Sequence, residues 1–195
     1  MTANTTTIDP VSRDALAERR RLGMWLFLAS LGMLFAASLV GFLVIRLRAP
    51  EWPPAGSPGL PTAFWISTAL LAAVSALLAK AEGAIREGRG SRASRLLAAA
   101  AVLGVAFVLS QASGWARLLA DSQLPQNNLY LFGIYVLTFL HALHVIGGLG
   151  PLIRAAIRSG AGRTTADDHG GVTLVAMYWH FLGLVWLGIL AVLAL

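Results

Sequence analysis

The chain has 195 residues, of which 57% are hydrophobic and only 12% are charged, and its net charge is +6. Soluble globular domains are nearer one quarter charged, so this composition excludes an ordinary soluble domain and indicates a membrane protein. The lack of cysteine excludes a disulfide framework and thiolate metal sites. The basic residues form short clusters between apolar stretches, which suits anionic lipid headgroups better than nucleic acid.

Five apolar segments follow a polar N-terminal tail at 1–21. The first apolar run has no small-residue cleavage site, so we expect a retained helix and not a signal peptide. About 20 apolar residues cross the hydrocarbon core of a bilayer. The sequence therefore predicts an all-α fold, a polytopic membrane protein whose five-helix bundle forms one domain over 22–195. The predicted spans are 22–45, 62–80, 96–119, 129–153 and 172–195.

The connections between these spans differ in charge. Cytoplasmic connections of membrane proteins are enriched in lysine and arginine. The N-terminal tail and the connections 80–95 and 154–171 hold 12 of the 15 basic residues, and the opposite side holds three. We therefore expect a cytoplasmic N-terminus and a periplasmic C-terminus. A short, cysteine-free chain rich in alanine and arginine favours a bacterial inner membrane.

Three histidines, but no acidic residue, lie inside the predicted spans: His141, His144 and His180. Neutral imidazole can ligate haem iron, copper or zinc, and residues three apart share one helix face. A zinc hydrolase would also need a glutamate base, which these spans lack. Hydrogen bonding between helices is the commoner role, so the three are weak metal candidates. An independent haem or metal protein stays open, whereas a transporter is disfavoured by the lack of ionisable groups along a pathway.

Other residues in and near the spans have expected structural roles. Gln111 should form hydrogen bonds between helices, and Trp52 and Trp115 lie near outer ends of spans, where aromatic belts occur. Small residues allow helices to approach closely in a bilayer. The glycines expected to do so are Gly41, Gly104, Gly147, Gly148 and Gly183.

Six stretches resemble, in chain order, the cytochrome c oxidase subunit III family of haem–copper respiratory oxidases. They are "RLGMWLFLAS" (21–30), "EWPP" (51–54), "STALLAAVSALLAKA" (67–81), "GVAFVLSQASGW" (104–115), "HALHVIGG" (141–148) and "YWHFLGLVWL" (178–187). His169 also falls where the family often has a histidine before its last helix. The resemblance covers about residues 21 to 195 and matches the family's short, five-helix form.

The resemblance implies a non-catalytic subunit that packs against oxidase subunit I, together with subunit II, and binds phospholipid in a cleft between its helices. It implies no haem or copper in this chain, because these cofactors belong to the partner catalytic subunits. The whole oxidase passes electrons of the respiratory chain from a donor such as cytochrome c to oxygen and translocates protons. An accessory subunit of a nitric oxide reductase is the alternative. Taken together, the residues and the resemblance lead us to expect lipid-contacting or structural roles for Arg19, Arg20, Arg21, Trp52, Gln111, Trp115, His141, His144, His169, Tyr178, Trp179 and His180.

The chain also departs from the family at four positions where carboxylates are usual. These positions hold Leu31, Gly114, Thr173 and Gly183. We therefore expect a divergent member in which these acids are dispensable, either in an oxidase with a different proton-uptake arrangement or in a protein associated with nitric oxide reductase.

Overall fold

The computed structural model describes residues 10–121, 128–164 and 170–194, with side chains in the first helix from residue 15 onward. Over these residues the chain forms five α-helices, and all five are long and apolar enough to cross a membrane. They are α1 (Pro10–Arg48), α2 (Thr62–Arg86), α3 (Gly90–Asp121), α4 (Leu129–Gly160) and α5 (Gly170–Ala194). The predicted all-α fold with five membrane-spanning helices is confirmed.

The helices extend beyond the apolar segments at the arginine-rich end of the bundle. α1 begins at Pro10, inside the predicted polar tail, and α2 continues to Arg86, inside the charged connection 80–95. Alanine, glutamate, lysine and arginine are strong helix formers, so a charged segment of this composition continues a helix. The α2–α3 connection is consequently a short turn at 87–89, where Gly88 takes a φ of 71° that suits glycine.

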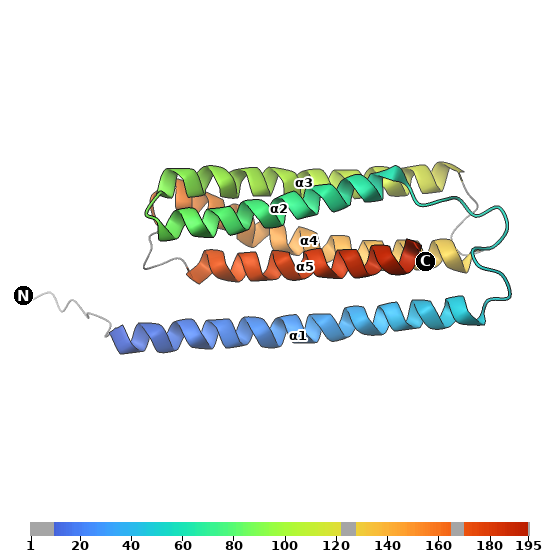
Figure 1. Cartoon of the computed structure of the whole chain (residues 1–195), viewed down its shortest axis with the longest axis horizontal. Coiled ribbons are helices and arrows are strands. Elements are labelled where there is room, and N and C mark those ends of the chain that lie inside the picture. Colours follow the sequence, from blue (N-terminus) through green and yellow to red (C-terminus); the bar gives the residue numbers. More distant parts are fainter. Residues whose placement is uncertain (1–9, 122–127, 165–169, 195) are drawn as a thin grey trace, which may run out of the picture.

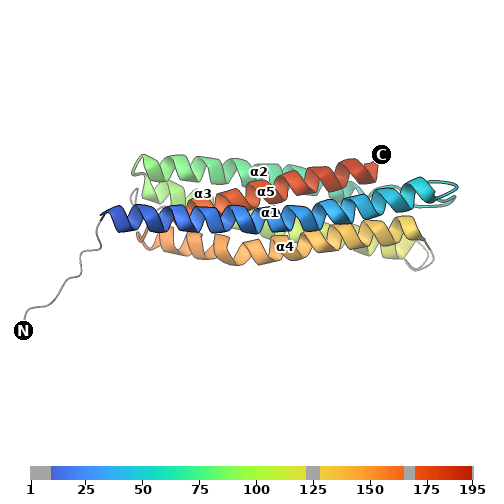
Figure 2. The ribbon, with the colours of Figure 1, turned by 90° about the horizontal axis from the view of Figure 1, so that it is seen from below.

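The five helices lie side by side along the long axis of the molecule (Figure 1). α2 and α3 form a tight hairpin, and α2, α3, α4 and α5 pack around a common core. In the described part of the chain, α1 packs only against α4 and α5 and not against α2, its neighbour in sequence (Figure 2). The proline-rich segment 49–61 allows this separation because it crosses the end of the bundle opposite the arginine-rich end without forming a helix.

The bundle core is centred on α5. Trp179 and Trp186 are among the largest fully buried side chains, and each has a partner for its indole N–H. Trp179 Nε1 donates to the carbonyl oxygen of Gly148 at 3.3 Å, and Trp186 Nε1 donates to Thr68 Oγ1 at 2.9 Å. The outer face is apolar as well, since Trp25 is 55% exposed and Leu184 is 69% exposed, as a lipid-facing surface requires.

The proline-rich loop 49–61 is attached to α1 and α4. The ring of Trp52 packs edge-on against Phe42 of α1 and Tyr130 of α4, with centroid distances of 5.4 Å in both cases. Asn128 caps α4 by accepting from the backbone N–H groups of Tyr130 and Leu131, and its Nδ2 donates to Ser57 Oγ at 3.0 Å. Such a cap satisfies backbone donors that the helix itself leaves unpaired.

Two of the expected glycines allow close helix contacts. A Cβ on Gly104 would lie 2.8 Å from both the Trp179 ring and the Leu149 side chain, and one on Gly148 would lie 2.6 Å from the Tyr178 ring. Gly183 makes an ordinary contact, since a Cβ there would lie 3.6 Å from Ser75 Oγ. Within the described chain, a Cβ on Gly41 or on Gly147 would have no neighbouring atom within 4 Å. Neither glycine is therefore needed for close helix packing inside this subunit.

We predict that Gly104→Ala destabilises the bundle by about 1–3 kcal/mol, because the added methyl group overpacks a site closed by a fully buried tryptophan. Thermal denaturation of the purified protein in detergent measures this effect. Gly41→Ala is the matched control, since its methyl group meets no neighbour in the chain. Equal denaturation temperatures for the two variants would contradict the prediction.

Candidate functional site

An apolar cleft of about 560 Å³ lies between α1 on one side and α4 and α5 on the other. Met24 and Phe27 of α1, His144 of α4 and Tyr178 of α5 contribute to its walls. Gly147 and Gly148 also line the cleft, and their lack of side chains leaves space beside α4. The open space found next to Gly147 is therefore part of this cleft and not a defect of helix packing.

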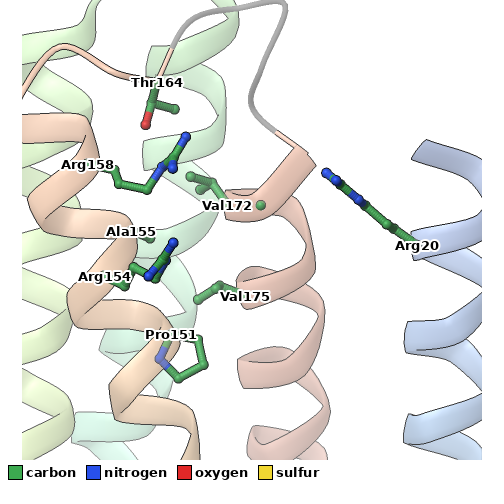
Figure 3. A pocket seen from close by; sticks show the side chains of 9 residues that line it. Arg20, Pro151, Arg154, Ala155, Arg158, Thr164, Val172 and Val175 are labelled. Atoms are coloured by element: carbon green, nitrogen blue, oxygen red, sulfur yellow. The ribbon is translucent and has the colours of Figure 1, made fainter. Parts of the chain in front are cut away.

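A second hollow of about 530 Å³ adjoins the apolar cleft and forms a basic mouth to it. The two share Pro151, Gly171 and Val175. Arg20 reaches toward the mouth from α1, while Arg154 and Arg158 extend from successive turns of α4 (Figure 3). Residues four apart lie on one helix face, so α4 presents both of its guanidinium groups to the same hollow.

The lining of the basic mouth favours an anion. Among the described residues, the side chains that line it carry three guanidinium groups and no carboxylate. Guanidinium binds phosphate with two parallel hydrogen bonds, and it is less strongly hydrated than an ammonium group. All three arginines are exposed, so their charges stay in contact with water or headgroups while their stems cover apolar surface. A phosphate above an apolar chain matches this pairing of mouth and cleft.

The three N-terminal arginines predicted to contact lipid are not equivalent. Arg20 lines the basic mouth, whereas Arg19 and Arg21 are exposed and do not line it. Sequence reasoning used Arg154 and Arg158 only for orientation and missed them as site residues. Their spacing of four, at the end of an apolar span, was the available signal.

The paired histidines have different surroundings although they share a helix. His141 is fully buried, and its ring lies 5.2 Å from that of Trp186 and 5.7 Å from that of Phe107. His144 lines the apolar cleft, packs against Phe35 and places Nδ1 2.7 Å from the carbonyl oxygen of Leu140. Since a carbonyl oxygen only accepts, Nδ1 of His144 carries the proton of that hydrogen bond.

The histidines are not assembled into a ligand set in the described ranges. Among these residues no group of three or more histidine, cysteine, aspartate or glutamate side chains is placed to hold a metal ion. His180 is half-buried on α5. His169 lies outside the described residues.

The predicted aromatic residues connect helices. Tyr178 donates from its hydroxyl to the carbonyl oxygen of His144 at 2.8 Å and stacks on Phe27 of α1, so it joins three helices at the cleft wall. Trp115 Nε1 donates to Thr138 Oγ1 at 2.9 Å and thereby links α3 to α4. Trp179 lies in the core, and its indole N–H donates to the carbonyl oxygen of Gly148 on α4.

The four positions at which the resemblance leads one to expect a carboxylate are occupied in different ways. Leu31 is 5% exposed and forms part of the apolar core. At Gly114 a Cβ would lie 2.9 Å from the Phe64 ring, so that ring takes the space of any larger side chain. Thr173 is half-buried near the start of α5, and Gly183 faces Ser75. At least two of the sites, Leu31 and Gly114, are therefore packed for apolar neighbours.

Comparisons with known proteins agree on one family. The model of the family described as "Cytochrome c oxidase subunit III" matches residues 4–194. Cytochrome c oxidase subunit 3 of Synechocystis sp. is 30% identical over 170 residues, which cover 86% of this chain and 72% of that protein. The same subunit of Thermostichus vulcanus is 29% identical over 174 residues, covering 86% of this chain and 83% of that protein.

A third relative extends the match to another bacterial group. The probable cytochrome c oxidase subunit 3 of Nocardia farcinica is 29% identical over 172 residues, covering 87% of this chain and 84% of that protein. The six sequence stretches, the five membrane-spanning helices and a family match over nearly the whole length agree with one another. The chain belongs to the cytochrome c oxidase subunit III family.

Proposed function

We propose that the chain is the subunit III of a bacterial haem–copper oxidase, a non-catalytic membrane subunit that packs against the catalytic subunit I and binds anionic phospholipid beside α1. The family match over residues 4–194 carries this proposal. Subunits of this family hold no redox cofactor, so haem, copper and oxygen reduction belong to the partner subunits. The relatives compared above are named as oxidase subunits, which does not favour the nitric oxide reductase alternative.

The exposed apolar surface supports association in the membrane. α1 is the least buried of the five spans, since only 22% of its most apolar stretch is buried inside the subunit. Large apolar side chains such as Leu26 and Met33 lie on its exposed surface. In a bilayer such a surface suits either lipid tails or the helices of another subunit, and helices associate there by close packing.

The basic mouth and the apolar cleft together support phospholipid binding. Arg20 and Arg154 would hold the phosphate, and an acyl chain would lie along Phe27 and Tyr178. In the orientation with a cytoplasmic N-terminus, this mouth is level with the cytoplasmic headgroups of the bacterial inner membrane. Anionic lipid attracts basic residues there.

The proposed function is tested by tagging the chain in its native host and purifying it in mild detergent. We expect haem bands in the reduced-minus-oxidised spectrum together with a co-purifying oxidase subunit I. Co-purification of a nitric oxide reductase catalytic subunit would replace the leading proposal by its alternative. Haem bands from the solitary chain would instead make its intramembrane histidines ligands.

The lipid role predicts that Arg20→Gln combined with Arg154→Gln lowers the phospholipid retained per purified complex, since one guanidinium is lost from each wall of the mouth. Quantitative mass spectrometry of extracted lipid measures the change. Arg19→Gln with Arg21→Gln removes the same charge from side chains that do not line the mouth, and we expect its lipid content to stay at the parent level. Equal lipid loss in the two double variants would show that general surface charge, and not this mouth, holds the lipid.

The proposal that the missing acids are dispensable predicts no gain from restoring one. Leu31→Glu places a carboxyl group in an apolar core, where an unpaired polar group costs about 1–3 kcal/mol. We therefore expect lower thermal stability. We also expect that the purified oxidase sustains turnover no longer than the parent does. Leu31→Met controls for the change of shape. Longer-lived turnover in Leu31→Glu alone would mean that the acid has a role that this chain has lost or moved.

A further inference from the structure

Two of the polar side chains that are 0% exposed have no polar partner within the described part of the protein. They are Gln111 of α3 and His141 of α4, and both are 0% exposed. The unpartnered atoms are both polar atoms of the Gln111 amide and both ring nitrogens of His141. Burying such groups without a hydrogen bond is costly, and a bilayer offers no bulk water to relieve the cost.

The contacts on either side of these residues place them at the same depth on facing helix surfaces. One turn before Gln111 on α3, the ring of Phe107 lies 5.7 Å from the ring of His141. One turn after Gln111, Trp115 Nε1 donates to Thr138, which precedes His141 by three residues on α4. α3 and α4 run antiparallel (Figure 1), so Gln111, which lies between Phe107 and Trp115 on α3, falls at the level of residues 138–141 of α4.

The other polar groups of this layer are already engaged. Thr138 Oγ1 donates to the carbonyl oxygen of Ile134 at 2.6 Å and accepts from Trp115. Trp186, whose ring lies 5.2 Å from that of His141, donates its N–H to Thr68. Gln111 and His141 therefore differ from these groups, since none of their side-chain polar atoms has a partner among the described residues.

The chemistry of the pair selects its ligand. An amide offers a carbonyl acceptor and an NH₂ donor, and neutral imidazole offers one donor and one acceptor. Aromatic rings of Phe35, Phe107 and Trp186 surround His141, which leaves no charged group among the described residues to balance an ion. A buried water typically makes about three hydrogen bonds to groups that would otherwise be unsatisfied.

We propose that Gln111 and His141 together bind one ordered water molecule, which connects α3 to α4 in the middle of the bundle. The water either donates to the Gln111 carbonyl oxygen and accepts from the imidazole N–H of His141, or donates to the acceptor nitrogen of the ring and accepts from the Gln111 NH₂. With the bonds from Trp115 to Thr138 and from Trp186 to Thr68, it forms a polar layer that sets the rotation of α3, α4 and α5. The site lies within this chain, so it does not depend on whether the partner subunit reduces oxygen or nitric oxide.

The direct test is the structure of the purified complex, determined at a resolution at which ordered waters are visible in the partner subunits. We expect a density peak within hydrogen-bond distance of both the Gln111 amide and the His141 ring. Absence of the peak would overturn the proposal. Direct contact between the amide and the ring would also overturn it, because it would leave the water no place.

A double-mutant cycle tests whether the two side chains act as one site. Gln111→Met and His141→Phe should each lower the temperature at which the complex dissociates. The double variant should dissociate at a temperature no lower than that of the less stable single variant, because no polar group is then left without a partner. Ser113→Ala, an exposed position on α3, is the control. Strictly additive losses would contradict a shared site, and the density test on the parent protein stays decisive if a variant fails to assemble.

Discussion

The arrangement of this bundle depends on the packing of two tryptophans of α5 against three other helices. The ring of Trp179 closes over Gly104 of α3 and Gly148 of α4. Trp186 lies against Phe64 of α2 and Phe107 of α3 and bonds to Thr68. Lipid tails are as apolar as these side chains, so burial from water cannot hold the helices together once they are in a bilayer. Close contact over glycine and a hydrogen bond for each indole N–H take its place.

α1 is held differently, and the candidate lipid site follows from that difference. Its contacts with α4 and α5 combine aromatic pairs, such as Phe27 with Tyr178 and Phe35 with His144, with buried aliphatic side chains such as Leu31. Gly32 allows the ring of Phe181 to approach at 3.6 Å from its Cβ position. α1 is the least buried of the five spans, and beside these contacts an apolar space remains between it and α4 and α5. Where that space reaches the arginine-rich end, it opens into the basic mouth.

At two of the positions where the resemblance leads one to expect a carboxylate, the core is packed with apolar groups. Leu31 is itself part of the apolar core, and the ring of Phe64 packs at Gly114. Three of the polar groups that remain near the core centre, Thr68, Thr138 and Trp186, are used in hydrogen bonds between helices or along one helix. Such bonds stabilise and orient helices in a membrane without carrying charge across it.

The sequence by itself determined the all-α class, the five spans and the family, because length, apolar content and motif order are properties of contiguous residues. It also singled out Gln111, His141 and Tyr178, but not what each one contacts. Only the tertiary structure decided that His141 is enclosed while His144 lines a cleft. It also decided that Arg20 lies on the opposite side of the basic mouth from Arg154 and Arg158. It also decided that α1 packs on α4 and α5 and that Asn128 bonds to Ser57. The physical reason is that a span is apolar on its lipid face and its core face alike, so hydrophobic periodicity cannot tell which side meets a neighbouring helix.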